Sequence, residues 1–198
     1  MVIMTREILI FVEDTFHRAF LEALLQRLAA SFRLPIHLEL RNSVGGYGKV
    51  ISELKGFVSN WRLERESFPD LLVVATDANC HGLNERKNAV IKAVPNELST
   101  VCAIPDPHIE RWMLLDSKAF KTVFGRGCDA PDQKCDKGRY KMLLAQAMVT
   151  AGVTPLLGGA EYAADIAAAM DLDHAAQLDP SFQHFLRDLR AVLVGWSQ

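Results

Sequence analysis

The sequence predicts an α/β protein with three layers, in which helices cover both faces of a mainly parallel four-stranded sheet and a helical C-terminal extension follows. Two observations favour this fold. Short apolar runs alternate four times with segments of helical periodicity up to residue 116. Beyond that residue, only helical patterns remain. At 198 residues the chain suits one structural domain, with an α/β core at 1–116 and an extension packed on it at 117–198.

The first two strands are predicted at residues 7–12, a buried apolar run, and at 36–40, where apolar and polar residues alternate. Between them, apolar residues recur at helical spacing as far as Phe32, after a start at which Thr15 can cap the helix. Pro35 ends that helix. A glycine-rich turn at 42–48 then leads to a second helix over 49–61.

The third strand is predicted at residues 70–76, the most strand-like stretch of the chain, and the fourth at 100–104. Helices are expected at 83–94 and 107–115. The extension is predicted to hold helices at 117–123, 137–151, 160–170 and 181–194, the last of them capped by Ser181. A glycine-containing loop at 125–138 separates the first two.

Composition excludes some classes of protein. No apolar run reaches the roughly 18–20 residues that cross a bilayer, and the first residues lack the basic lead and apolar core of a signal peptide. Four cysteines in a chain of this length do not form a disulfide scaffold. Reduced thiols and a cytoplasmic location are therefore expected.

The net charge of −2 conceals an uneven distribution. Residues 118–141 carry seven Lys or Arg against three Asp, a balance of +4, whereas residues 161–179 carry five acids and no Lys or Arg, a balance of −5. The basic segment is compatible with a contact to phosphate, although charge alone favours a solvated helix face.

Acidic residues follow three of the four predicted strands, where parallel sheets form their sites. Glu13 and Asp14 follow the first strand, Asp77 with Asn79 the third, and Asp106 with Glu110 the fourth. Converging carboxylates repel one another unless a cation lies among them, and hard oxygen ligands suit Mg²⁺. The sequence therefore predicts a metal site at this edge of the sheet.

The same positions resemble the Toprim fold, the catalytic core of topoisomerases, bacterial primases and nucleases of the overcoming-lysogenization-defect type. That fold has a lone glutamate after its first strand, here Glu13, and a later strand that ends in Asp-x-Asp, here Asp77-Ala78-Asn79. The stretches 104–112 and 134–141 resemble small Toprim-like proteins encoded near bacterial phage-defence genes. The resemblance covers about residues 7–141, and Asn79 departs from it by replacing the second acid.

The resemblance implies a Mg²⁺-dependent nuclease, with Mn²⁺ as a substitute metal, that cleaves phosphodiester bonds of DNA or RNA and acts as a phage-defence effector. Glu13 would be a metal ligand or general base, Asp77 the principal ligand and Glu110 a further ligand. Lys137 or Lys141 would stabilise charge on the scissile phosphate. Asn79 offers a neutral oxygen to the metal, which weakens a second metal site.

Other readings of the sequence stay open. With Asn79 in place of an acid, the chain could be a non-catalytic module that binds nucleic acid or a partner ATPase. An acid pair after the first strand and Asp77 after the third also resemble a receiver domain that accepts a phosphoryl group, although no fifth strand with Lys-Pro follows. Structural zinc lacks a close cysteine pair. The turn at 45–48 either brings backbone to a phosphate or only reverses the chain, and His17, His37 and His108 have no assigned role.

Overall fold

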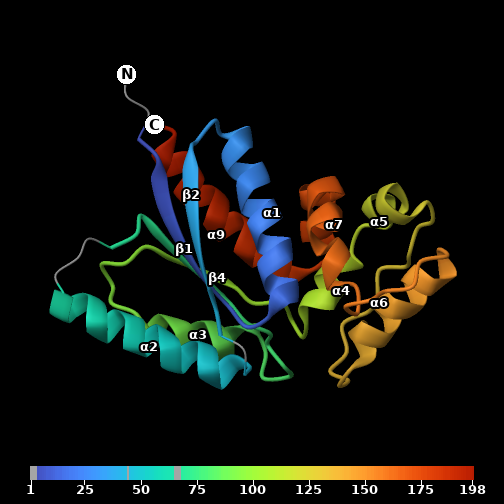
Figure 1. Cartoon of the computed structure of the whole chain (residues 1–198), viewed down its shortest axis with the longest axis horizontal. Helices are drawn as coiled ribbons and strands as arrows, with labels where there is room; N and C mark the ends of the chain where they lie inside the picture. The colour runs from blue at the N-terminus through green and yellow to red at the C-terminus, as the bar shows by residue number, and fades with distance from the viewer. Residues whose placement is uncertain (1–3, 44, 65–67) are drawn as a thin grey trace.

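The computed structural model describes residues 4–43, 45–64 and 68–198, so Val44 of the predicted glycine-rich turn lies outside the described residues. The α/β part contains four strands and the helices between and after them (Figure 1). In chain order these elements are β1 Arg6–Val12, α1 Thr15–Ser31, β2 Ile36–Asn42, α2 Tyr47–Glu64, β3 Leu71–Ala75, α3 Leu83–Ala93, β4 Thr100–Ala103 and α4 Ile109–Met113.

The four strands form one parallel sheet in the order β2-β1-β3-β4. The strands β1 and β3 are central, and Val12 at the end of β1 pairs with Ala75 at the end of β3. This register places the residues after both strands, Glu13 and Thr76, at the same edge. The predicted α/β fold with a parallel four-stranded sheet is confirmed.

Two apolar cores form because successive strand residues point to opposite faces of the sheet. One face of β1 and β3 carries Ile10 and Val73, which pack with α1, α7 and α9. The other face carries Phe11 and Val74, which pack with α2 and α3. Figure 1 shows these two groups of helices on opposite sides of the sheet, as a three-layer fold requires.

The C-terminal helices share the first of these cores with α1, so the extension packs directly on the α/β part. They are α5 Ser117–Phe124, α6 Arg139–Thr150, the short 3-10 helix η1 Ala160–Tyr162, α7 Ala163–Ala169, α8 Leu172–Leu178 and α9 Pro180–Trp196.

Two local predictions about helix ends are wrong, and one helix was missed. Asp14 caps α1 instead of Thr15, since its carboxylate accepts the His17 N–H. Asp179 caps α9 instead of Ser181, and Ser181 lies inside the helix. The helix α8 was not predicted, because its seven residues show too little periodicity, although Asp171 accepts the His174 N–H as a normal N-cap.

In the described residues, no helix is long and apolar enough to cross a membrane.

Candidate metal centre

Asp77 lies in the loop just after β3 and is only 8% exposed. One carboxylate oxygen, Oδ1, accepts a hydrogen bond from the N–H of Ile109 at 2.9 Å, which gives the first N–H of α4 a partner. The other, Oδ2, lies 2.9 Å from Nδ1 of His108. The side chain therefore ties the end of β3 to the start of α4, the helix that carries Glu110.

Glu110 is a buried carboxylate that lacks a hydrogen-bond donor. It is 1% exposed, and neither oxygen accepts a hydrogen bond from any described residue. The nearest cation is Nζ of Lys141, 3.8 Å from Oε1, on a side chain that is mostly exposed. Burial raises the pKa of Glu110, and the nearby charge of Asp77 raises it further. Such a group is costly to bury as a carboxylate unless a cation or a proton neutralises it.

Three side chains converge at this point. Asp77, His108 and Glu110 each offer one ligand atom, and these atoms lie within 4.8 Å of one another. Because the ligands of one ion approach it to about 2.0–2.6 Å, atoms this close can share it. The hydrogen bond that His108 donates to Asp77 raises the pKa of His108, so a metal at His108 must compete with a proton.

His17 lies behind Asp77 and is fully buried in α1. Its Nδ1 is 2.8 Å from Asp14, and its Nε2 is 3.2 Å from Oδ1 of Asp77, an ion-pair contact without the alignment of a hydrogen bond. Burial opposes the charged ring, but the two carboxylates outweigh it and raise the pKa of His17 to about 10. Burial likewise favours protonation of Asp77, yet the charge of His17 and the hydrogen bond with His108 hold the pKa of Asp77 at about 2.

Glu13 lies at the same edge but bonds to the loop backbone. Its Oε2 accepts the hydroxyl of Thr76 and, at 3.0 Å, the N–H of Asp77. Its Oε1 faces Gly46, where an added Cβ would lie 3.6 Å away. In the part of the chain that the structure describes, Glu13 does not belong to the group of three that could hold an ion. It contacts that group through the backbone of Asp77.

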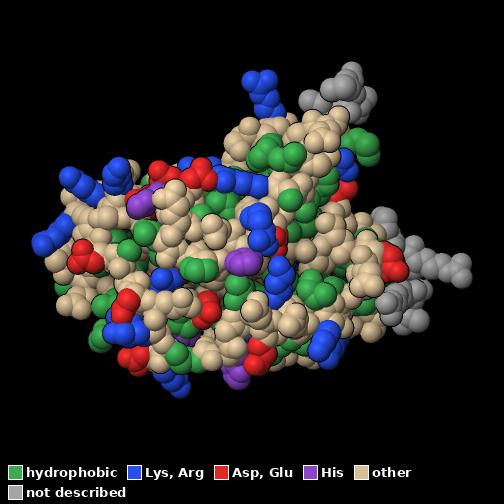
Figure 2. Space-filling model, turned by 180° about the vertical axis from the view of Figure 1, so that it is seen from behind, with side chains coloured by type: hydrophobic (Ala, Val, Ile, Leu, Met, Phe, Trp, Pro, Cys, Tyr) green, Lys and Arg blue, Asp and Glu red, His purple; other side chains and the backbone are tan. Residues whose placement is uncertain are grey.

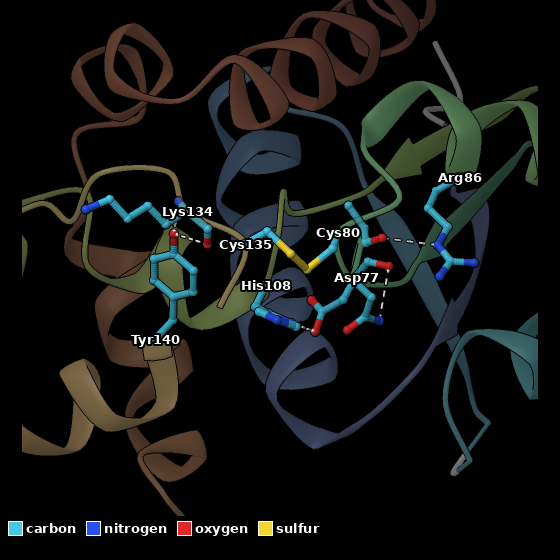
Figure 3. Close-up of a disulfide and its surroundings, with 9 residues drawn as sticks. Asp77, Cys80, Arg86, His108, Lys134, Cys135 and Tyr140 are labelled. Carbon is cyan, nitrogen blue, oxygen red and sulfur yellow. Dashed lines mark hydrogen bonds and ion pairs between the residues drawn. A yellow bond between two sulfur atoms is a disulfide. The ribbon is translucent and has the colours of Figure 1, made fainter. Parts of the chain in front are cut away.

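Asn79 and Cys80 form a tight turn after Asp77. Both have positive φ angles, +49° and +68°, and the Asn79 amide donates to the Asp77 carbonyl at 3.5 Å. Cys80 forms a disulfide with Cys135, which fastens this turn to the loop before α6 (Figure 3). The expectation that all four thiols are reduced is therefore wrong. The partners are 55 positions apart in the sequence, so spacing could not reveal the pair. The disulfide removes the ground for expecting a cytoplasmic location.

The two candidate lysines lie near α6 in different settings. Lys141 is in the first turn of α6 and is the cation nearest Glu110. Lys137 is exposed, two residues after Cys135. Within the same segment, Asp132 pairs with Lys134 and Arg139, so two of the seven basic side chains already have an acidic partner. On the face in Figure 2, basic and acidic side chains are interspersed and form no single patch.

Sequence reasoning missed His17 and His108. His108 is two residues before Glu110, just beyond β4, so its place at a strand end was the available signal. His17 gave no comparable signal, because its role depends on the packing of α1 against the sheet edge. Cys102 and Trp112 are buried in the apolar core.

Comparison with protein-family models, with curated proteins and with solved structures found no match.

Proposed function

We propose that this protein is a divalent-metal-dependent hydrolase that cleaves phosphodiester bonds in nucleic acid. The observation that carries the proposal is the buried, unbonded carboxylate of Glu110 beside Asp77 and His108. A bound cation would neutralise this carboxylate. The resemblance to Toprim nucleases in the order of Glu13, Asp77 and Glu110 supports the choice of reaction.

The donor set of two carboxylates and one imidazole fits a divalent cation. Asp77, His108 and Glu110 would hold it, and an imidazole ligand suits Mn²⁺ or Zn²⁺ at least as well as the Mg²⁺ expected from oxygen ligands alone. When bound, such an ion lowers the pKa of water and neutralises charge on a phosphate. Asn79 can offer only a neutral amide oxygen, which favours one metal site over two.

The surrounding residues orient this group. Asp14 and His17 fix Asp77 from behind, since outer contacts of this kind set the orientation of a metal ligand. Glu13 has one oxygen, Oε1, that accepts no hydrogen bond from the described residues, and it can take a proton from a water molecule at the sheet edge. Lys141 and Lys137 lie on the α6 side and would face the nucleic-acid backbone.

A non-catalytic module that binds nucleic acid or a partner ATPase is the second candidate. It is favoured by one observation: both oxygens of Asp77 already have protein partners. A receiver-like phosphoacceptor has less support, because Asp77 is buried and the described sheet ends at β4 without a fifth strand.

Cleavage of supercoiled plasmid and of tRNA with Mg²⁺, Mn²⁺ or Zn²⁺ tests the proposal. We expect cleavage that EDTA abolishes and that Glu110→Gln reduces at least about hundredfold, since even outer contacts of metal ligands contribute 10–100-fold. Glu97→Gln, at an exposed glutamate on the loop before β4, is the matched control and should cleave normally. Absence of cleavage with all three metals, together with retained nucleic-acid binding, would favour the binding module.

A further inference from the structure

Arg86 of α3 is a buried arginine without an acidic partner. It is 8% exposed, and it forms no ion pair with any described residue. Its Nε donates to the Ala78 carbonyl at 3.3 Å, and its guanidinium lies 3.7 Å from the centre of the Tyr47 ring. Its two terminal amino groups have no hydrogen-bond partner within the described chain. These amino groups are therefore available to bind an anion.

The contacts of Arg86 place it beside Glu13. Arg86 touches Tyr47 and Ala78, while Glu13 approaches Gly46 and accepts the N–H of Asp77. Gly46 and Tyr47 are consecutive in the chain, and so are Asp77 and Ala78. Arg86 and Glu13 therefore occupy neighbouring positions between the same two segments. They nevertheless form no ion pair. Figure 3 shows Arg86 on the other side of the Asp77 loop from His108 and Cys135.

The helix α2 begins at this point with Tyr47. Its first turn contains no acidic residue, and the first N–H groups of a helix lack partners within it and attract anions. An added Cβ on Gly48 would meet no atom within 4 Å, so the first turn faces open space. A guanidinium and a helix N-terminus therefore flank an accessible position next to Glu13.

We propose that Arg86 and the N-terminus of α2 bind a backbone phosphate of a nucleic-acid strand, on the Tyr47 side of Asp77. The guanidinium offers two amino groups to the phosphate oxygens, and the Tyr47 ring keeps its plane fixed. The choice of a nucleic-acid strand rests on the proposed function. The phosphate chemistry itself does not, because it follows from Arg86 and α2.

Two matched pairs of variants test this site. Gly48→Glu puts a negative charge in the first turn of α2 and leaves Arg86 in place, while Gly56→Glu makes the same change in open space later in that helix. Arg86→Gln removes the guanidinium. Arg27→Gln is its control. Arg27 donates to the carbonyls of Ala167 and Met170, so this variant removes an arginine that has a structural role only.

Binding of a short fluorescein-labelled single strand is measured by anisotropy in EDTA, so that the result does not depend on cleavage. We expect Gly48→Glu and Arg86→Gln to lose about tenfold or more in affinity, and Arg86→Gln to lower the slope of log K against log salt by about 0.7. Gly56→Glu and Arg27→Gln should bind like wild type. Gly48→Glu should also melt at or above the wild-type temperature, because it leaves the contacts of Arg86 intact and glutamate suits the first turn of a helix better than glycine does.

Gly48→Glu binding as tightly as Gly56→Glu would overturn the site and leave Arg86 as a brace between α2 and the Asp77 loop, even if Arg86→Gln were weak or unfolded. A wild-type chain that binds inorganic phosphate but no strand would overturn the nucleic-acid assignment. If the strand binds as expected but no metal supports cleavage, the phosphate site stands and the nuclease proposal fails.

Discussion

At the scale of single residues, the candidate centre is a row of charges in which each group depends on its neighbour. Asp14 holds His17, His17 contacts Asp77, and Asp77 contacts His108. Only Glu110, at the end of this row, has no protein donor. Among the described residues, every other carboxylate of this row has a protein partner at hydrogen-bond distance, and Glu110 is the one that a bound cation would neutralise.

The buried pair of His17 and Asp77 predicts a pH dependence of stability. The pKa of His17 is raised to about 10, so its contribution is full below pH 6.5 and is lost as pH rises toward 10. The pKa of Asp77 is lowered to about 2, so its contribution is full above pH 3.8 and is lost as pH falls toward 2. We expect His17→Gln to cost about 3 kcal/mol near pH 6 and less at pH 10.

Urea unfolding of wild type and of His17→Gln in EDTA, at pH 6 and at pH 10, measures this cost. His37→Gln is the control, because His37 pairs with Glu7 on the surface. A cost for His17→Gln that stays constant from pH 6 to pH 10 would contradict the ionised pair.

At the scale of elements, the Cys80–Cys135 disulfide fastens the turn after β3 to the loop before α6. Closing a chain segment of 55 residues is expected to stabilise the fold by about 4 kcal/mol on the chain-entropy model. We expect Cys80→Ser to lower the free energy of unfolding by about that amount, and dithiothreitol to have no further effect on this variant.

Thiol counting checks the same bond. The unfolded, unreduced protein should show two thiols, Cys102 and Cys128, and not four. In the folded protein both should react slowly with iodoacetamide, because burial raises their pKa values to about 12. Four reactive thiols in the unreduced protein would contradict the disulfide.

The elements that the sequence predicts well are those with a repeating apolar pattern, such as β3 and α1. Helix ends were less predictable, because Asp179 and Ser181 are both residue types that cap helices well. In the structure, the Ser181 hydroxyl and the Phe182 N–H both donate to Asp179, which identifies Asp179 as the cap. The site was predictable where it depends on strand ends, as for Asp77 and Glu110. It was not predictable where it depends on packing between distant segments, as for His17 and the disulfide.

At the scale of the whole molecule, the parallel sheet brings the candidate metal centre and the proposed phosphate site to one edge. Glu13 is common to both, since it contacts the backbone of Asp77 on one side and Gly46 on the other. The α6 side adds Lys141 and the nearby Lys137. A nucleic-acid strand that follows this edge would contact Arg86 at one end and Lys137 and Lys141 at the other.

This arrangement predicts that binding of nucleic acid depends on salt at the α6 side as well. Lys137→Ala and Lys141→Ala should each lower the slope of log K against log salt by about 0.7–0.9, if each removes one phosphate contact. Lys92→Ala, at an exposed lysine of α3, is the control for loss of one positive charge. Unchanged slopes for both α6-side variants would make the segment an ordinary solvated face.

We propose that Asp77, His108 and Glu110 bind a divalent cation, and melting temperatures in EDTA and in Mn²⁺ are the sharpest test of that binding. In EDTA, Glu110→Gln should melt at or above the wild-type temperature, because it removes a buried charge without a donor. With Mn²⁺ at 100 times its Kd, wild type and Glu97→Gln should gain about 2.7 kcal/mol, and Glu110→Gln almost nothing. Equal gains for wild type and Glu110→Gln, or no gain for wild type, would contradict the claim.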